Sequence, residues 1–89
     1  MLEETVVLRN RLGLHARAAA KLVHTASAYA SKITLTKNGD EVDSKSILGL
    51  LLLAAGKGTP LKLRVEGADE EEAFEAVKSL IDRRFDEID

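Results

Sequence analysis

The chain has 89 residues, enough for one domain with a single hydrophobic core, and we expect that domain to span residues 1–89. Thirteen basic and fifteen acidic residues give a net charge of −2, and together with only three aromatic residues this argues against a nucleic-acid-binding protein. Because the sequence has no cysteine, no basic and apolar leader, and no apolar run longer than residues 47–55, we expect a cytoplasmic protein without disulfides, export signal or membrane-inserted segment.

The first predicted elements are a strand and a helix. Residues 5–9 are β-branched and apolar at their centre, which predicts a strand that ends at Asn10. From Ala16 the period changes, and small or apolar residues recur at helical spacing: Ala19, Leu22, Val23, Ala26 and Ala30. This pattern predicts an amphipathic helix whose small-residue stripe lies close to a sheet.

A hairpin and a short helix follow. Residues 32–37 alternate apolar and polar side chains, and the Asn38-Gly39 pair predicts a two-residue turn into a return strand centred on Val42. Ser46 then precedes the apolar run 47–55. We expect this run to form a short helix that ends at Gly56.

The last two predicted elements are a strand and the longest helix. Residues 60–66 alternate in the manner of a strand with one buried face, and the acidic run 69–72 lies where a helix start favours negative charge. Helical spacing continues through Phe74, Val77, Leu80, Ile81, Phe85 and Ile88. The order β-α-β-β-α-β-α favours an α+β sandwich, an antiparallel sheet covered by helices on one face.

His15 is the first candidate for chemistry. It lies at the start of the predicted first helix, where unpaired backbone N–H groups and the helix dipole favour an anion such as phosphate. A neutral imidazole can carry a covalent group, and Arg17 can offer paired hydrogen bonds to phosphate oxygens. The alternative is that His15 only caps the helix or lies on the surface, and these residues alone leave both interpretations open.

Other motifs give no cofactor or metal site. His15 and His24 are nine residues apart, about 13.5 Å along a helix, so they cannot share an ion within the chain. Residues 49–59 resemble a nucleotide-binding loop only superficially, because the glycine spacing is wrong and the leucines favour a helix. Without a carboxylate pair, a nucleophile elbow or clustered ligands, a binding or carrier protein is favoured over a free-standing enzyme, and we expect no cofactor.

The helix expected after Ser46 raises two further possibilities. Ser46 can cap it, and a phosphate on the same hydroxyl would add charge beside the helix start; the sequence allows both. Residues 47–53 hold more apolar side chains than one face of a two-turn helix can bury. The surplus predicts an exposed partner site, although dense core packing or self-association explains it as well.

Two motifs carry a resemblance to a known family. GLHARAAA at residues 13–20 and DSKSILGL at residues 43–50 resemble HPr, the histidine-containing phosphocarrier of the phosphoenolpyruvate-dependent sugar phosphotransferase system. The resemblance covers essentially the whole chain. It implies an open-faced sandwich with a four-stranded antiparallel sheet under three helices, in which His15 accepts a phosphoryl group on Nδ1.

The resemblance also implies partners and further site residues. Enzyme I would donate the phosphoryl group and the A domain of a sugar-specific enzyme II would receive it, while Arg17 and the amides of Ala16 and Ala18 hold the phosphate. Ser46 matches the serine that HPr kinase/phosphorylase modifies in many Gram-positive bacteria. The candidate docking residues are Leu14, Ala20, Ile47, Leu48 and Leu51, and a monomer is the family expectation.

The chain departs from the family pattern at three positions in the predicted first helix. Ala18 stands where the family usually has proline, and His24 and Ser27 stand where many relatives carry lysine.

Two other functions remain open. A paralogous regulatory or nitrogen-related carrier would use the same histidine, whereas a small metabolite- or protein-binding regulatory domain would use His15 only as a cap.

Overall fold

The computed structural model describes residues 1–87 and confirms the predicted order of elements. The strands are β1 (Leu2–Val7), β2 (Lys32–Lys37), β3 (Asp40–Asp43) and β4 (Pro60–Glu66). The helices are α1 (Ala16–Ser27), α2 (Ile47–Leu53) and α3 (Glu70–Asp82), and a 3₁₀ turn, η1 (Arg84–Asp86), follows α3.

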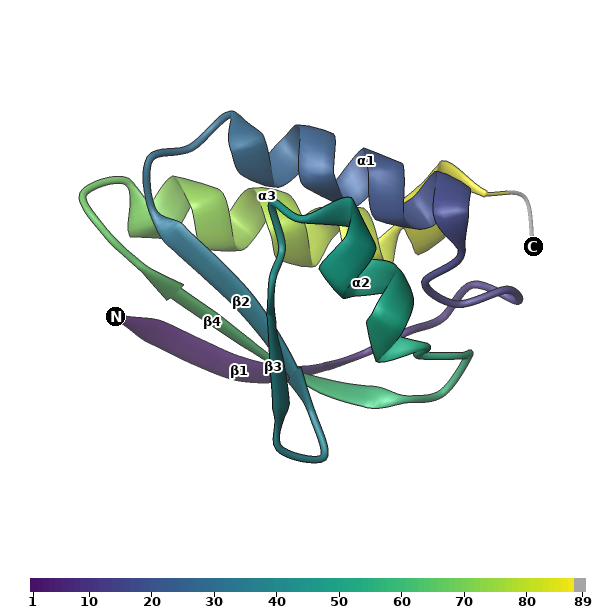
Figure 1. Cartoon of the computed structure of the whole chain (residues 1–89). Helices are drawn as coiled ribbons and strands as arrows, with labels where there is room; N and C mark the ends of the chain where they lie inside the picture. Colours follow the sequence, from purple (N-terminus) through teal and green to yellow (C-terminus); the bar gives the residue numbers. More distant parts are fainter. Residues whose placement is uncertain (88–89) are drawn as a thin grey trace.

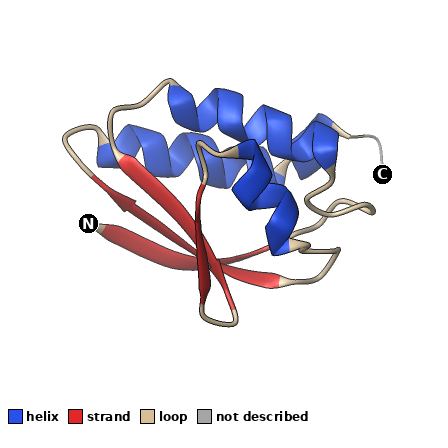
Figure 2. Cartoon of the chain, in the orientation of Figure 1, coloured by secondary structure: helices blue, strands red, loops and turns tan. Residues whose placement is uncertain are grey.

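The strands form one antiparallel sheet in the order β1-β4-β2-β3. All three helices lie on the same face of this sheet, with α1 and α3 running side by side in opposite directions (Figures 1 and 2). The expected α+β open-faced sandwich is therefore confirmed. Its topology brings the start of α1 and the end of α3 together at one end of the molecule (Figure 1).

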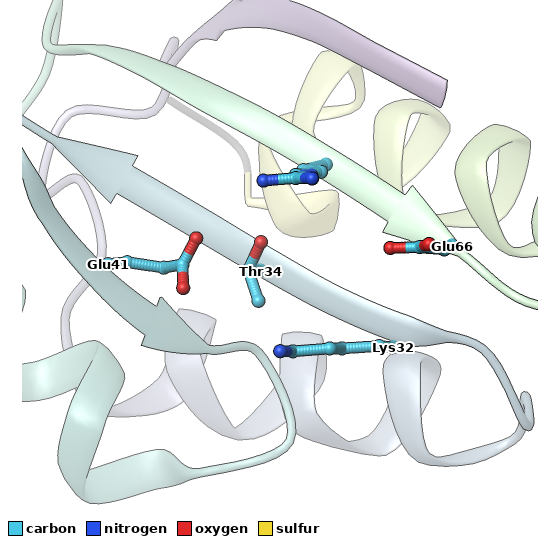
Figure 3. A pocket seen from close by; sticks show the side chains of 5 residues that line it. Lys32, Thr34, Glu41 and Glu66 are labelled. Atoms are coloured by element: carbon cyan, nitrogen blue, oxygen red, sulfur yellow. The ribbon is translucent and has the colours of Figure 1, made fainter. Parts of the chain in front are cut away.

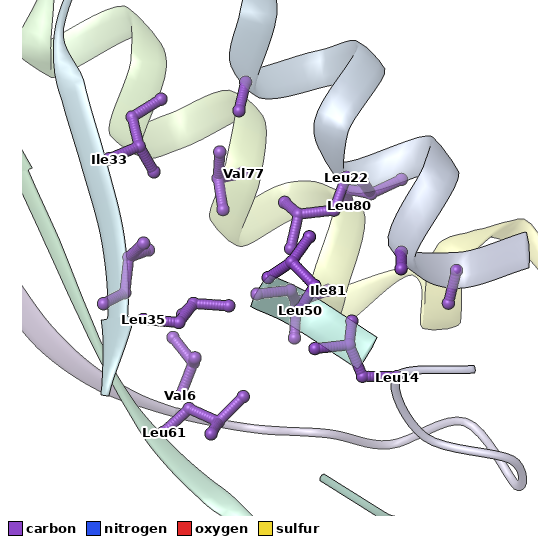
Figure 4. Packing of buried hydrophobic residues seen from close by; sticks show 14 of the residues in the cluster. Val6, Leu14, Leu22, Ile33, Leu35, Leu50, Leu61, Val77, Leu80 and Ile81 are labelled. Atoms are coloured by element: carbon purple, nitrogen blue, oxygen red, sulfur yellow. The ribbon is translucent and has the colours of Figure 1, made fainter. Parts of the chain in front are cut away.

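The core lies between the sheet and the helices because the strands alternate strictly. In β4, Leu61, Leu63 and Val65 are fully buried while Lys62 and Arg64 are exposed on the other face. Ala18, Ala19, Leu22 and Ala26 of α1 are buried in this core, and the helix packs mainly against α2 and α3. Figure 4 shows the two layers meeting through Val6, Ile33, Leu35 and Leu61 from the strands and Leu22, Leu50, Val77, Leu80 and Ile81 from the helices.

The other face of the sheet is uncovered and polar. Lys32, Thr34, Glu41, Arg64 and Glu66 line a depression of about 90 Å³ across β2, β3 and β4 (Figure 3). Cations and carboxylates are interleaved there across neighbouring strands, an arrangement that keeps an open sheet face hydrated.

Several predicted boundaries were wrong. The first strand is Leu2–Val7 rather than 5–9, because its ladder with β4 begins at Leu2 and ends where Val7 meets Pro60. The second helix ends before Ala54, which adopts the left-handed conformation (φ 52°) expected of Gly56. The first helix ends at Ser27, which leaves Ala30 outside it, and the third ends at Asp82, which leaves Phe85 in η1. Ile88 lies outside the described residues.

Asp69 has a structural role that the sequence did not reveal. Its carboxylate accepts hydrogen bonds from the Ala30 N–H at 2.8 Å, the Ser31 N–H at 2.9 Å and the Ser31 hydroxyl at 2.5 Å. These bonds join the connection between α1 and β2 to the start of α3. They hold the pKa of the Asp69 carboxyl below its usual range, the Ser31 hydroxyl contributing most.

Asp69→Asn is expected to destabilise the protein in a pH-dependent way. The lowered pKa in the folded state means that the stabilisation is complete above the pKa of the unfolded chain and is lost as the pH falls through the folded-state pKa. Urea unfolding of both proteins from pH 7 into the acid range should therefore show a stability difference that shrinks with acidification. Glu71→Gln, an exposed change in the same helical turn, is the control. A difference independent of pH would contradict the role of the charge.

Candidate functional site

His15 is the residue immediately before α1, as the sequence predicted. Its backbone is extended (φ −77°, ψ 179°) and its carbonyl accepts the first helical hydrogen bond, from the Ala19 N–H at 2.8 Å. The N–H groups of Ala16, Arg17 and Ala18 therefore have no acceptor within the helix. The imidazole is about one quarter exposed, at the positive end of the helix dipole.

The loop before His15 is fixed against the end of α2. Gly13 adopts φ +63°, and a Cβ atom there would lie 2.5 Å from the Ala55 carbonyl oxygen. The next residue, Leu14, donates its N–H to the same carbonyl at 2.8 Å and buries its side chain. Only glycine fits this close approach, which fixes the loop that leads into His15 against the segment after α2.

The His15 side chain lines a shallow depression of about 720 Å³. Ala16, Arg17 and Lys21 line it from α1, Leu12 from the preceding loop, and Asp86 and Glu87 from the end of the chain. Arg17 is exposed, whereas the Lys21 ammonium is held by the Phe85 carbonyl at 2.6 Å. The depression therefore brings one imidazole, one exposed guanidinium and two carboxylates together at the start of α1.

The sequence interpretation missed two residues of this site. Glu87 places one carboxylate oxygen, Oε2, against His15 Nε2, and its Oε1 accepts a hydrogen bond from Asn10 Nδ2 at 2.9 Å. The fully buried Asn10 also donates to the Gly13 carbonyl at 2.7 Å. Seventy-two residues separate Glu87 from His15, so no local pattern indicated the contact.

Two of the expected site residues are buried. Leu14 belongs to the core and cannot present its side chain to a partner. Ala18 is fully buried and is not among the residues that line the depression. Ala16 and Arg17 do line the depression, and Ala20 is exposed one turn further along α1.

The α2 helix carries an apolar surface beside this site. Leu50 and Leu53 are buried in the core, while Ile47, Leu48 and Leu51 are exposed, together with Leu52, which the sequence analysis did not single out and whose exposure is 73%. The four exposed side chains form what we call the α2 patch. Its exposure in the isolated chain rules out dense core packing as the explanation of these four residues.

Ser46 caps α2, because its hydroxyl oxygen accepts a hydrogen bond from the Gly49 N–H at 3.2 Å. Replacing Ser46 with alanine is expected to lower the free energy of unfolding by about 0.5–2 kcal/mol. Ser46→Asp should retain most of the stability because a carboxylate can accept the same bond. Urea denaturation of both variants measures the difference, with Ser27→Ala on the exposed end of α1 as control. Equal stability of the alanine variant and the parent would contradict the capping role.

Over residues 1–87 no helix is both long and apolar enough to cross a membrane, and no group of three or more His, Asp or Glu side chains is arranged to hold a metal ion.

Comparison with known proteins places this geometry in a family context. A family model described as the PTS HPr component phosphorylation site matches residues 2–83. The phosphocarrier protein HPr of Xylella fastidiosa strain 9a5c is 49% identical over 87 residues, which cover 98% of each chain. The phosphocarrier protein NPr of Shewanella violacea is 42% identical and covers 97% of this chain and 94% of its own.

Solved structures agree with the fold. A crystal structure of HPr-C-His from Thermoanaerobacter tengcongensis superimposes with a TM-score of 0.94 at 45% identity over 98% of each chain. A second structure from that organism, described as an HPr dimer, gives a TM-score of 0.79 at the same identity and covers 98% of this chain and all of that one.

Proposed function

This chain belongs to the HPr phosphocarrier family of the phosphotransferase system, and from that premise we propose that His15 is the residue that accepts and passes on the phosphoryl group. The observation that carries the proposal is the position of His15 as N-cap of α1, in an open depression with the exposed Arg17. In this proposal the chain is a covalent carrier in the cytoplasm rather than a free-standing enzyme.

The transfer proceeds in two displacements. The lone pair of His15 Nδ1 attacks the phosphorus of phospho-enzyme I, and the bond from phosphorus to the donor nitrogen breaks with its electron pair returning to the donor. A nucleophile of the A domain of a sugar-specific enzyme II then takes the phosphoryl group from His15. Arg17 and the Ala16 N–H hold the phosphate oxygens. Contacts of this exposed kind, each worth about 0.3–1 kcal/mol at a helix terminus, stabilise the adduct modestly and keep it transferable.

The α2 patch supplies the docking surface in this proposal. Ile47, Leu48 and Leu51 lie exposed on α2, and Ala20 lies exposed on α1 beyond Arg17. Enzyme I and the A domain of enzyme II would bind here in turn, each with one monomer of the carrier. Phosphorylation of Ser46 by an HPr kinase/phosphorylase would put negative charge at the edge of the same surface and weaken docking.

A carrier of a nitrogen-related phosphotransferase chain is the second candidate, favoured by the similarity to NPr. It uses the same histidine and the same chemistry. The donor decides between the two, because only the cognate enzyme I transfers the phosphoryl group rapidly.

Intact-mass analysis after incubation with enzyme I, magnesium and phosphoenolpyruvate tests the proposal. We expect one acid-labile phosphoryl adduct on the parent protein and on His24→Ala, and none on His15→Ala. An adduct that persists in His15→Ala would assign the chemistry to another residue. If neither an active enzyme I of a sugar phosphotransferase system nor one of a nitrogen-related system produced an adduct, the proposed carrier function would be wrong. Ligand-dependent thermal stabilisation would then favour a metabolite-binding domain.

A further inference from the structure

The chain after α3 makes an unusual turn toward the active site. Arg84, Phe85 and Asp86 all have positive φ angles (58°, 55° and 61°), although none of them is glycine. Such conformations are costly and persist where surrounding contacts enforce them, often at functional sites. Here the Phe85 side chain is fully buried, and the backbone carbonyl of Phe85 accepts a hydrogen bond from the Lys21 ammonium at 2.6 Å. These contacts fold the end of the chain back beside the first turn of α1 (Figure 1).

This turn delivers Glu87 to His15. The Glu87 side chain is only 13% exposed, with one carboxylate oxygen on His15 Nε2 and the other on Asn10 Nδ2. Asn10 is itself oriented, because the same nitrogen donates to the Gly13 carbonyl at 2.7 Å. Glu87 lies beyond residues 2–83, which the family model matches. Hydrogen bonds thus link three residues in series, from the buried side-chain amide of Asn10 through the Glu87 carboxylate to the His15 imidazole.

The chemistry of the three groups determines the form of the ring. An ionised carboxylate only accepts hydrogen bonds, so the nitrogen against Glu87 must carry the proton. In the neutral ring the other nitrogen, Nδ1, then holds the lone pair. When Nδ1 bonds to phosphorus the ring becomes cationic, and the carboxylate at Nε2 is placed to stabilise that charge.

We infer that Glu87 is a positioning residue for His15: held by Asn10, its carboxylate fixes the Nε2–H form of the imidazole and leaves Nδ1 as the nitrogen that accepts phosphate. The inference rests on the proposed carrier function and deepens it. It assigns the choice of ring nitrogen to a residue at the end of the chain, outside the motif that contains the histidine.

Glu87→Gln is the sharpest test because Asn10 constrains the new amide. The glutamine oxygen must face the Asn10 amino group, which turns the glutamine amino group toward His15 Nε2 and favours a lone pair there. Long-range ¹H–¹⁵N NMR of the neutral ring should show Nε2–H in the parent and a shift toward Nδ1–H in Glu87→Gln. Asp82→Ala removes an exposed carboxylate at the end of α3 that does not line the depression, and it should keep the parent pattern.

Phosphorylation by phosphoramidate provides a second readout without enzyme I. A ring nitrogen attacks phosphorus, the P–N bond of the reagent breaks, and ammonia leaves with a proton. We expect phosphate on Nδ1 in the parent and in Asp82→Ala. In Glu87→Ala the ratio of Nε2 to Nδ1 phosphohistidine, measured by ³¹P NMR, should rise about 10- to 100-fold, the range for losing one hydrogen bond to a charged group.

The outcomes separate this inference from the proposed function. If enzyme I phosphorylates His15 while tautomer and ring position are the same in the parent and both Glu87 variants, Glu87 has no positioning role. If the tautomer and ring position respond as expected but enzyme I never phosphorylates the chain, the carrier function fails and the positioning of the ring stands. A shift of equal size in Asp82→Ala would also overturn the inference, because it would reflect general loss of negative charge.

Discussion

Replacing Phe85 with alanine is expected to lower the free energy of unfolding by about 3–5 kcal/mol, a fall of roughly 15–30 °C in melting temperature for a domain of this size. Phe85 heads the fully buried side chains when they are ranked by volume. Its backbone holds a left-handed conformation that the buried ring helps to enforce. Removing the ring both opens a cavity and releases the turn that carries Glu87, so urea and thermal unfolding should show one of the largest losses in the chain.

Phe74→Ala is the matched control for this prediction. Phe74 is on α3 and only packs against the edge of the core. Its replacement should cost clearly less, because less apolar surface returns to water. Equal losses for the two variants would mean that the η1 turn is not anchored by Phe85.

Replacing Arg17 with alanine is expected to slow phosphoryl transfer to His15 by about 100-fold, the lower end of what removing one preorganised donor costs. Arg17 is exposed in the depression with His15, and its guanidinium can offer two parallel hydrogen bonds to phosphate oxygens. Rapid-quench measurement of transfer from phospho-enzyme I gives the rate, and thermal unfolding should be nearly unchanged.

Two further variants distinguish the effect of the guanidinium geometry from the effect of its positive charge. Arg17→Lys keeps the charge but loses the fork and should fall between the parent and alanine. Arg83→Ala removes a nearby cation that is engaged with Asp86 and Ser79, and it should transfer at the parent rate. If Arg17→Ala also transferred at the parent rate, phosphate binding would rest on the helix-start amides without the guanidinium.

The fold could be predicted from the sequence because its signals are local. Alternation in residues 60–66 and the Asn38-Gly39 pair identify a strand and a turn without reference to the rest of the chain. The end of α2 could not be predicted in the same way, since Ala54 takes a conformation that its own side chain disfavours. Tertiary contacts made that choice.

The candidate site also contains residues with a local sequence signal and residues that only tertiary contacts bring there. His15 and Arg17 could be proposed as site residues because a helix start with a histidine is a local pattern. The burial of Leu14 could not be predicted because it depends on packing against the segment after α2, and Glu87 was missed because 72 residues separate it from its partner. A glutamate in a charged C-terminal segment gives no signal until the η1 turn is known.

The positions of the N-terminus and of residues 84–87 also determine where a label can be attached without disturbing His15. The N-terminus lies at the opposite end of the molecule from the start of α1, whereas the C-terminal segment passes beside it (Figure 1). A fluorophore, affinity tag or surface linkage attached ahead of Met1 would leave His15 facing free solution, although it would disturb the ion pair between the terminal ammonium and Glu70. A label attached to a side chain within residues 84–87 would instead lie close to the imidazole, so rates measured on such a protein would report the label as well as the carrier.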